Sequence, residues 1–113
     1  ELRDATFQRA SLDGTVFAEA DGFRAKFLSA SLTDADFTGA RLQSADFTKA
    51  ILTNAVLADT DLRGARFVGA DLGGADLSGA RVEDAIFRNA NLVGATWIDG
   101  TRICAEGSIG TCR

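Results

Sequence analysis

Histidine, tyrosine, methionine and proline are absent from this sequence of 113 residues, and cysteine occurs only twice. Histidine is the side chain that most often serves as a general base or a metal ligand, so its absence removes the simplest routes to catalysis and to a zinc site. No run of about 18 apolar residues is present to cross a membrane as a helix. We therefore expect no enzyme, no catalytic residue, no bound metal, no cofactor, no small-molecule substrate and no transmembrane segment.

The sequence does contain a five-residue repeat. From Leu2 to Trp97, every residue number ending in 2 or 7 is Leu, Phe, Val or Trp, with Gly22 as the exception. Every number ending in 5 or 0 over this span is Ala, except Thr15 and Thr60. A period of five would scatter the large residues around a helix and would put them on alternate faces of a strand. The chain must bend once per repeat, which predicts a solenoid of stacked coils.

The large residues fall into uniform rows when every fourth repeat is compared, which predicts coils of twenty residues with four sides. We number the sides in chain order by these inward rows. Side 1 has Leu2, Gly22, Leu42, Leu62 and Val82, and side 2 has Phe7, Phe27, Phe47, Phe67 and Phe87. Side 3 has Leu12, Leu32, Leu52, Leu72 and Leu92, and side 4 has Phe17, Phe37, Leu57, Leu77 and Trp97.

The repeated unit, a small residue, often Asp, then Leu or Phe and two variable residues, resembles the pentapeptide-repeat family over residues 2–99 or so. The resemblance implies an all-β fold, a right-handed quadrilateral parallel β-helix of about five coils of four pentapeptides. We expect residues 1–99 to form this β-helix and residues 100–113 to form a C-terminal cap. Because the chain begins with Glu1, we expect it to be a fragment or a processed chain, with any signal peptide upstream.

The last position of each repeat predicts the geometry of the corners. From residue 54 to residue 99 this position holds only Gly, Asn or Asp, which tolerate the positive φ of a type II turn. In the first half it also holds longer side chains, for which we expect an irregular turn with negative φ. These are Arg9, Glu19, Arg24 and Lys49.

Gly22 and Phe23 form the one irregularity inside the repeat. Gly22 leaves an inward position empty between Leu2 and Leu42, and such a void would cost about 2 to 5 kcal/mol unless it is filled. We favour a bulge that turns Phe23 into this space. The alternative is an exposed Phe23 that serves as a contact point.

Outward charges separate by side. Sides 3 and 4 carry eight acids and no Lys or Arg, whereas side 2 carries five bases and one acid. The two neighbouring acidic sides are a candidate interaction face, and we expect its partner to be a protein rather than a nucleic acid. The candidate residues are Asp13, Asp34, Asp36, Asp59, Asp71 and Asp76.

Two functions fit this layout. The preferred one is a non-enzymatic protein-binding or scaffolding solenoid. The alternative is a DNA mimic that inhibits or protects a type II topoisomerase such as gyrase, because the pentapeptide-repeat family includes such proteins. We favour the first because eight charges are sparse beside duplex DNA, which carries one charge per roughly 1.7 Å.

Cys104 and Cys112 lie in the expected cap. With no His and no third Cys, a zinc site would lack ligands, which leaves a disulfide, the interpretation we favour, or two buried thiols. The stretch from Trp97 to Cys112 also resembles the ends of exported pentapeptide-repeat proteins, and disulfides are typical of oxidising compartments. We therefore expect a periplasmic, lumenal or secreted protein, with the cytoplasm as the alternative. An open end coil predicts a possible homodimer.

Overall fold

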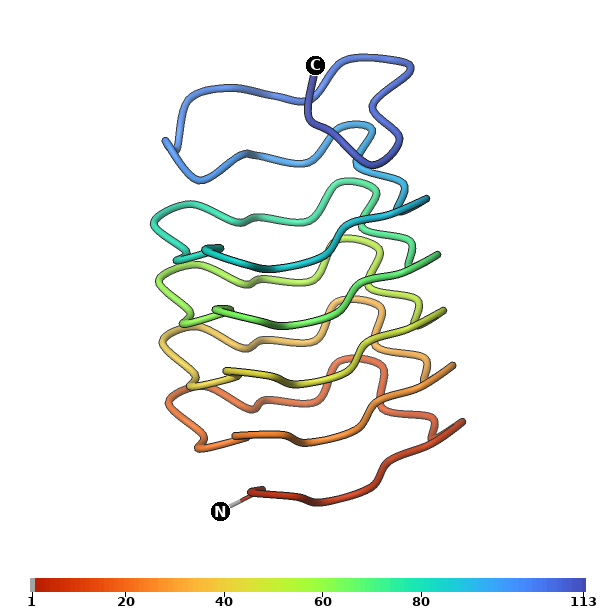
Figure 1. Ribbon diagram of the computed structural model, residues 1–113, viewed down its shortest axis with the longest axis vertical. Helices are drawn as coiled ribbons and strands as arrows, with labels where there is room; N and C mark the ends of the chain where they lie inside the picture. The colour runs from red at the N-terminus through yellow and green to blue at the C-terminus, as the bar shows by residue number, and fades with distance from the viewer. Residues whose placement is uncertain (1) are drawn as a thin grey trace.

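The computed structural model describes residues 2–113, which wind into a column of stacked coils with the two termini at opposite ends (Figure 1). Parallel bridges join residues that are 20 positions apart, from Thr6↔Lys26 to Asp76↔Thr96. This confirms the four-sided coil of twenty residues. Within the described residues there is no helix and no strand longer than one ladder residue per side. The molecule measures 34 × 25 × 23 Å.

Each repeat is held by hydrogen bonds to the coils on both sides of it. In the repeat of Phe27, the Phe27 N–H donates to Asp46 O at 2.7 Å in the next coil, and the Lys26 N–H donates to Ala5 O at 2.8 Å in the preceding coil. The Ala30 N–H closes the turn by donating to Phe27 O at 3.0 Å. The same pattern recurs in every interior repeat, so the backbone is satisfied without long strands.

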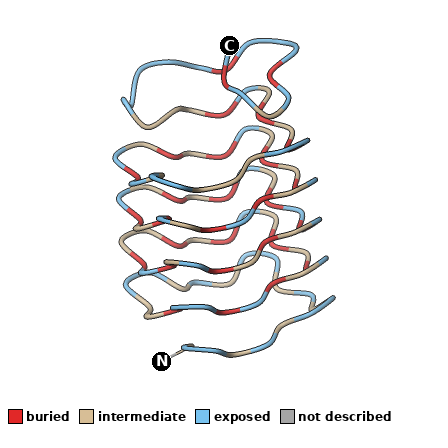
Figure 2. Cartoon of the chain, viewed as in Figure 1, coloured by how far each residue is buried: buried red, intermediate tan, exposed pale blue. Residues whose placement is uncertain are grey.

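The inward rows form one continuous core. The large side chains of the second to fourth coils, such as Phe27, Leu52 and Leu77, have no exposed area, and Figure 2 shows the buried residues concentrated in these coils. The Phe rings of side 2 stack at 4.9–5.0 Å between centroids. Because Ala beside each row is small, the opposite sides approach closely enough for Phe27 to meet Phe37 edge to face at 5.7 Å.

The corners differ from the sequence prediction. Residues Arg9, Glu19, Arg24 and Lys49 have φ of 60°, 63°, 57° and 60°, so the predicted negative φ is wrong. The cause is stacking: the corner N–H donates to the next coil, as Lys49 does to Val68 O at 2.9 Å, and this bond requires the same turn in every coil. Positive φ is confirmed from Asn54 to Gly94, but at the last corner it falls on Gly100 instead of Asp99.

The bulge predicted at Gly22 is also wrong. The ladder continues through Asp21↔Arg41, and the Gly22 N–H donates to Arg41 O at 2.7 Å. A Cβ on Gly22 would lie 2.8 Å from Leu42 Cδ2, so the Leu42 side chain already occupies the space. Phe23 stays outside, 36% exposed, with the Arg24 guanidinium carbon 4.9 Å from its ring centroid. This matches the alternative of an exposed Phe23, whose contact role stays a prediction.

Residues 100–113 fold back over the end of the column (Figure 1). They pair antiparallel with the last coil at Thr96↔Ile103 on side 4 and at Asn91↔Ile109 on side 3. Cys104 and Cys112, both buried, are joined by a disulfide with their Cα atoms 4.9 Å apart. This segment pairs with sides 3 and 4 of the last coil, whereas the outer N–H groups of Val82 and Asp84 on side 1 and of Phe87 and Asn89 on side 2 have no hydrogen bond within residues 2–113. Residues 2–113 contain no helix that is long and apolar enough to span a membrane.

Candidate protein-interaction surface

Three ladder acids of sides 3 and 4 each support the turn that follows them. Asp36 Oδ1 accepts the Thr38 N–H at 2.9 Å and the Thr38 hydroxyl at 2.6 Å. Asp76 accepts the equivalent pair from Ser78, and Asp71 accepts the Gly73 N–H at 2.9 Å. In each of these carboxylates, Oδ1 therefore fixes the backbone of the corner, and Oδ2 is left without a hydrogen bond to the described residues.

The hydrogen bonds to Asp36 stabilise its charged form. The Thr38 hydroxyl, and after it the Thr38 N–H, hold the pKa of Asp36 below its ordinary value, against a smaller opposing effect of burial. Asp36 consequently stays ionised at any pH at which a binding partner would meet it.

The other three candidate acids fall into two kinds, one that bonds to the neighbouring coil and two that stand free at corners. Asp13 joins two coils, because its Oδ1 accepts the Ser31 hydroxyl at 2.5 Å and the Thr33 N–H at 2.9 Å. Asp34 and Asp59 occupy corners with φ of 62° and 57°, are exposed, and have no side-chain hydrogen bond within residues 2–113. Their carboxylates are thus available to a partner.

The six acids do not gather into one cluster. They are spread over four successive coils, and on side 4 the ladder runs Val16, Asp36, Val56, Asp76, Thr96, so that a valine separates the two acids. With roughly 4.8 Å between paired strands, Asp36 and Asp76 lie about 10 Å apart. No group of three or more Cys, Asp or Glu that could hold a metal ion occurs in the described part of the chain.

Sides 1 and 2 carry the bases; on side 1 acids and bases form ion pairs, whereas side 2 has five bases and one acid. Side 1 has an Arg24–Asp4 ion pair at 3.0 Å between coils and an Arg63–Asp61 pair at 2.6 Å within one coil. Side 2 has one cross-coil pair, Arg66–Asp46 at 4.0 Å. The acids of sides 3 and 4 have no Lys or Arg on their own sides to pair with, so these two adjacent sides carry a net negative charge.

Sequence reasoning found the acids but missed an open edge on side 1, beside Val82. The available signal was Arg102, which stands at an inward position where a large apolar residue would continue the row. A charged residue there indicates that the chain leaves the coil before side 1 is covered.

The pentapeptide repeats family model matches residues 1–39, 30–67, 40–79 and 65–96. A comparison with curated protein sequences finds no significant match. Among solved structures, HetL, a pentapeptide repeat protein involved in heterocyst differentiation regulation from the cyanobacterium Nostoc sp. strain PCC 7120, is 35% identical with a TM-score of 0.81. The match covers 83% of this chain and 43% of HetL, so this chain spans less than half of that relative.

Two further structures share the fold. A pentapeptide repeat protein from the thylakoid lumen of Arabidopsis thaliana is 26% identical, with a TM-score of 0.53, over 92% of this chain and 84% of its own. QnrB1, a plasmid-mediated fluoroquinolone resistance protein, is 27% identical, with a TM-score of 0.56, over 80% of this chain and 56% of its own. Proteins built from this repeat are right-handed β-helices and generally non-enzymatic structural or binding solenoids. With repeats matched over residues 1–96 and this shared architecture, the chain belongs to the pentapeptide repeat family.

Proposed function

We propose that this chain is a non-enzymatic protein-binding solenoid whose acidic sides 3 and 4 contact the partner. One observation supports the proposal. The inward residues of each repeat form the core, whereas the outward residues of sides 3 and 4, which are adjacent, include eight acids and no Lys or Arg. A rigid column of this kind holds its charges at fixed spacings, which favours recognition of a complementary basic surface.

A six-residue Asp→Asn variant tests the proposal without disturbing the fold. Asn keeps the acceptor oxygen that Asp13, Asp36, Asp71 and Asp76 offer to backbone N–H groups, and Asn tolerates the positive φ of Asp34 and Asp59. The six changes are at Asp13, Asp34, Asp36, Asp59, Asp71 and Asp76.

The immobilised wild-type protein should capture a protein from its source cells that the six-Asn variant does not capture. A matched control on side 2 exchanges its bases for Gln and should retain the same protein, with binding that weakens as salt rises. Equal capture by the wild type and the six-Asn variant would remove sides 3 and 4 as the contact surface.

A second candidate function is a DNA mimic acting on a type II topoisomerase. The observation in its favour is that QnrB1, a fluoroquinolone resistance protein, shares the fold, together with the two acidic sides. The spacing weighs against it, because Asp36 and Asp76 lie about 10 Å apart, whereas duplex DNA carries one charge per roughly 1.7 Å. The test is gyrase supercoiling with added protein: an effect that the six-Asn variant loses would favour this candidate over the first.

We also propose an oxidising compartment, such as the periplasm, a lumen or the outside of the cell. The Cys104–Cys112 disulfide supports it, because such bonds persist where thiols are not kept reduced. Alkylation of free thiols before lysis, followed by intact mass measurement, tests the proposal. Two alkylated cysteines would place the protein in a reducing compartment instead.

A further inference from the structure

The open end of side 1, residues 80–84, is an unpaired β edge. Towards the preceding coil it is fully bonded: the Arg81 N–H donates to Thr60 O at 2.9 Å, and Arg81 O accepts the Leu62 N–H at 2.8 Å. Towards the C-terminal end, the Val82 N–H, the Asp84 N–H and the Ala80 carbonyl have no hydrogen bond within residues 2–113. The equivalent groups of every interior coil are paired, so this edge offers a ready pattern of two donors and one acceptor.

The edge exists because the chain leaves the coil after Asp99 instead of continuing along side 1. In an unbroken repeat, Gly100, Thr101 and Arg102 would pair with this edge and Arg102 would enter the core. Instead, Asp99 Oδ1 accepts the Thr101 N–H at 3.0 Å and the Arg102 N–H at 2.9 Å. Arg102 O then accepts the Trp97 N–H at 2.8 Å, which turns the chain back over side 4.

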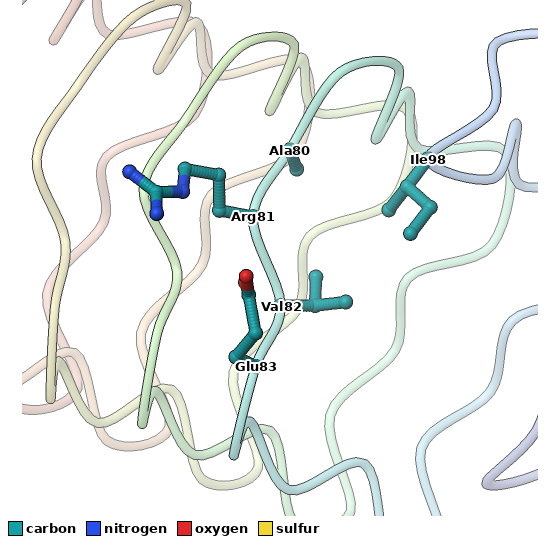
Figure 3. A pocket seen from close by; sticks show the side chains of 5 residues that line it. All are labelled: Ala80, Arg81, Val82, Glu83 and Ile98. Carbon is teal, nitrogen blue, oxygen red and sulfur yellow. The ribbon is translucent and has the colours of Figure 1, made fainter.

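A hollow marks the place that a continued coil would fill. It is lined by Ala80, Arg81, Val82, Glu83 and Ile98 (Figure 3). The side chains of Val82 and Ile98 point toward one another across it, whereas Arg81 points away (Figure 3). Val82 and Ile98 are each half-buried, so an aliphatic side chain placed between them would complete the core.

The charges beside the hollow specify what should stack there. The outward ladder of side 1 reads Asp21, Arg41, Asp61, Arg81, alternating in sign from coil to coil. One position after the inward row, Arg63 stands one coil below Glu83; its hydrogen bond to Asp61 is the main cause that raises the pKa of the Arg63 guanidinium, and the Glu83 charge adds to the effect. Continuing the alternation of the outward ladder places an acid over Arg81, and the exposed carboxylate of Glu83 favours a base above it.

We propose that this edge binds an extended peptide of a partner protein as an added parallel strand, with an acidic, an aliphatic and a basic residue in that order. The Val82 N–H donates to the carbonyl of the acidic residue, and the Asp84 N–H donates to the carbonyl of the basic residue. The N–H of the acidic residue donates to Ala80 O, and the aliphatic side chain fills the hollow. This surface is distinct from the acidic sides 3 and 4, so the proposal does not depend on the function proposed above.

The chain itself supplies the probe. The segment that already stacks under this edge is Thr60 to Gly64, so the test peptide is Thr-Asp-Leu-Arg-Gly with blocked ends. Titration of this peptide into the 15N-labelled full chain should shift the amide signals of Val82 and Asp84 most. The charge-reversed peptide, Thr-Arg-Leu-Asp-Gly, should bind about fivefold more weakly.

A variant of the protein with the two charges reversed tests the same charge preference. In Arg81→Glu with Glu83→Arg, the preference between the two peptides should reverse. If this double variant does not fold, Glu83→Arg alone should remove the preference for a basic third residue, because the Glu83 side chain is exposed and makes no hydrogen bond within the described chain.

Four results would overturn the proposal. The first is equal binding of the two peptides, and the second is shifts confined to the first coil, whose outer edge is also unpaired. The third is movement of the Val82 and Asp84 signals with protein concentration alone, which would assign the edge to a second copy of the chain. The fourth is the absence of any shift up to about 5 mM peptide, well above the millimolar affinity of a weak complex.

Discussion

Lys49 adopts a strained backbone conformation because it hydrogen-bonds to the next coil. Its φ of 60° lies in the left-handed region, which costs a residue with a Cβ about 1 to 2 kcal/mol, and its N–H bond to Val68 O holds it there. Gly69, directly above in the same corner row, has φ of 67° without this cost. Corner residues are therefore a local source of strain that differs from coil to coil.

Lys49→Gly should raise the free energy of unfolding by about 1 kcal/mol, because the strain disappears while part of the gain is lost to glycine entropy. Gly69→Ala should lower it by about the same amount, since the added Cβ would make only an ordinary van der Waals contact, 3.6 Å from Lys49 Cγ, which leaves the backbone strain as the main cost. Urea unfolding of both variants measures this. A change of the same sign in both would show that φ is not the cause.

The lowered pKa of Asp36 makes the stability of the fold depend on pH. The ordinary pKa of an Asp side chain is 3.8, and the Thr38 hydroxyl holds the pKa of Asp36 below it in the folded protein. Because the folded pKa is depressed, the stabilisation is complete above the unfolded pKa and is lost as the pH falls through the folded one. Asp61, bound by the Arg63 guanidinium, and Asp99, bound by the N–H groups of Arg102 and Thr101, contribute in the same acidic window.

Thr38→Ala should raise the pKa of Asp36 towards its ordinary value, because it removes the largest cause of the shift and leaves only the backbone N–H. Carboxyl 13C chemical shifts against pH measure it, and Asp36→Asn identifies the resonance. An unchanged midpoint in the Thr38→Ala variant would mean that the hydroxyl does not bind Asp36 in solution.

At the scale of the element, two interactions hold the C-terminal cap in place. Asp99 turns the chain out of the coil, and the Cys104–Cys112 disulfide closes the cap onto the last coil. The two cysteines are 8 residues apart in the sequence. The lost entropy of the unfolded chain alone should make this disulfide stabilise the fold by about 2.5 kcal/mol.

Cys104→Ser with Cys112→Ser should therefore lower the free energy of unfolding by about 2.5 kcal/mol at neutral pH. The loss should appear first as faster amide exchange in residues 103–112, and reduction of the wild type should reproduce it. Unchanged exchange in this segment would mean that the antiparallel pairing holds the cap by itself.

The element scale also shows how far sequence reasoning reaches. Rows of identical residues at 20-residue spacing predicted the coils, because a core row with parallel neighbours has to be uniform. The corners at Arg9 and Lys49 could not be predicted from single-residue propensity, since a hydrogen bond from the neighbouring coil decides their φ. The position of Phe23 depended on whether Leu42 could fill the gap, which is a packing question.

The candidate surface was predicted only in part. The six acids and their assignment to two sides follow from the 20-residue coil, but their use as turn acceptors by Thr38, Gly73 and Ser78 does not follow from spacing. Arg102 at an inward position signals that the coil ends before side 1 is covered, but the path that leaves the Val82 edge open depends on how Asp99 redirects the chain, which spacing does not show.

At the scale of the whole molecule, stability is shared between neighbouring coils. Each coil contacts only the one before and the one after, so an interior coil gains two interfaces and an end coil gains one. Leu52 has no exposed area, whereas Leu12 in the first coil is half-buried, which is the direct trace of the missing neighbour. In a protein of these 113 residues, the first coil is therefore expected to exchange its amides before the interior coils do.

Two matched variants in one row measure this gradient. Leu52→Ala should lower the free energy of unfolding by about 2 to 5 kcal/mol, because it leaves a cavity enclosed by two coils. Leu12→Ala should lower it by about 1 kcal/mol, because solvent already reaches part of this side chain. Amide exchange should show the same order, with Phe37 and Leu57 protected to the level of global unfolding and Phe7 and Leu12 exchanging faster. Equal losses of unfolding free energy in the two variants, with uniform protection of the amides from exchange, would mean that the first coil is covered in solution. Its apolar row would then be in contact with a partner.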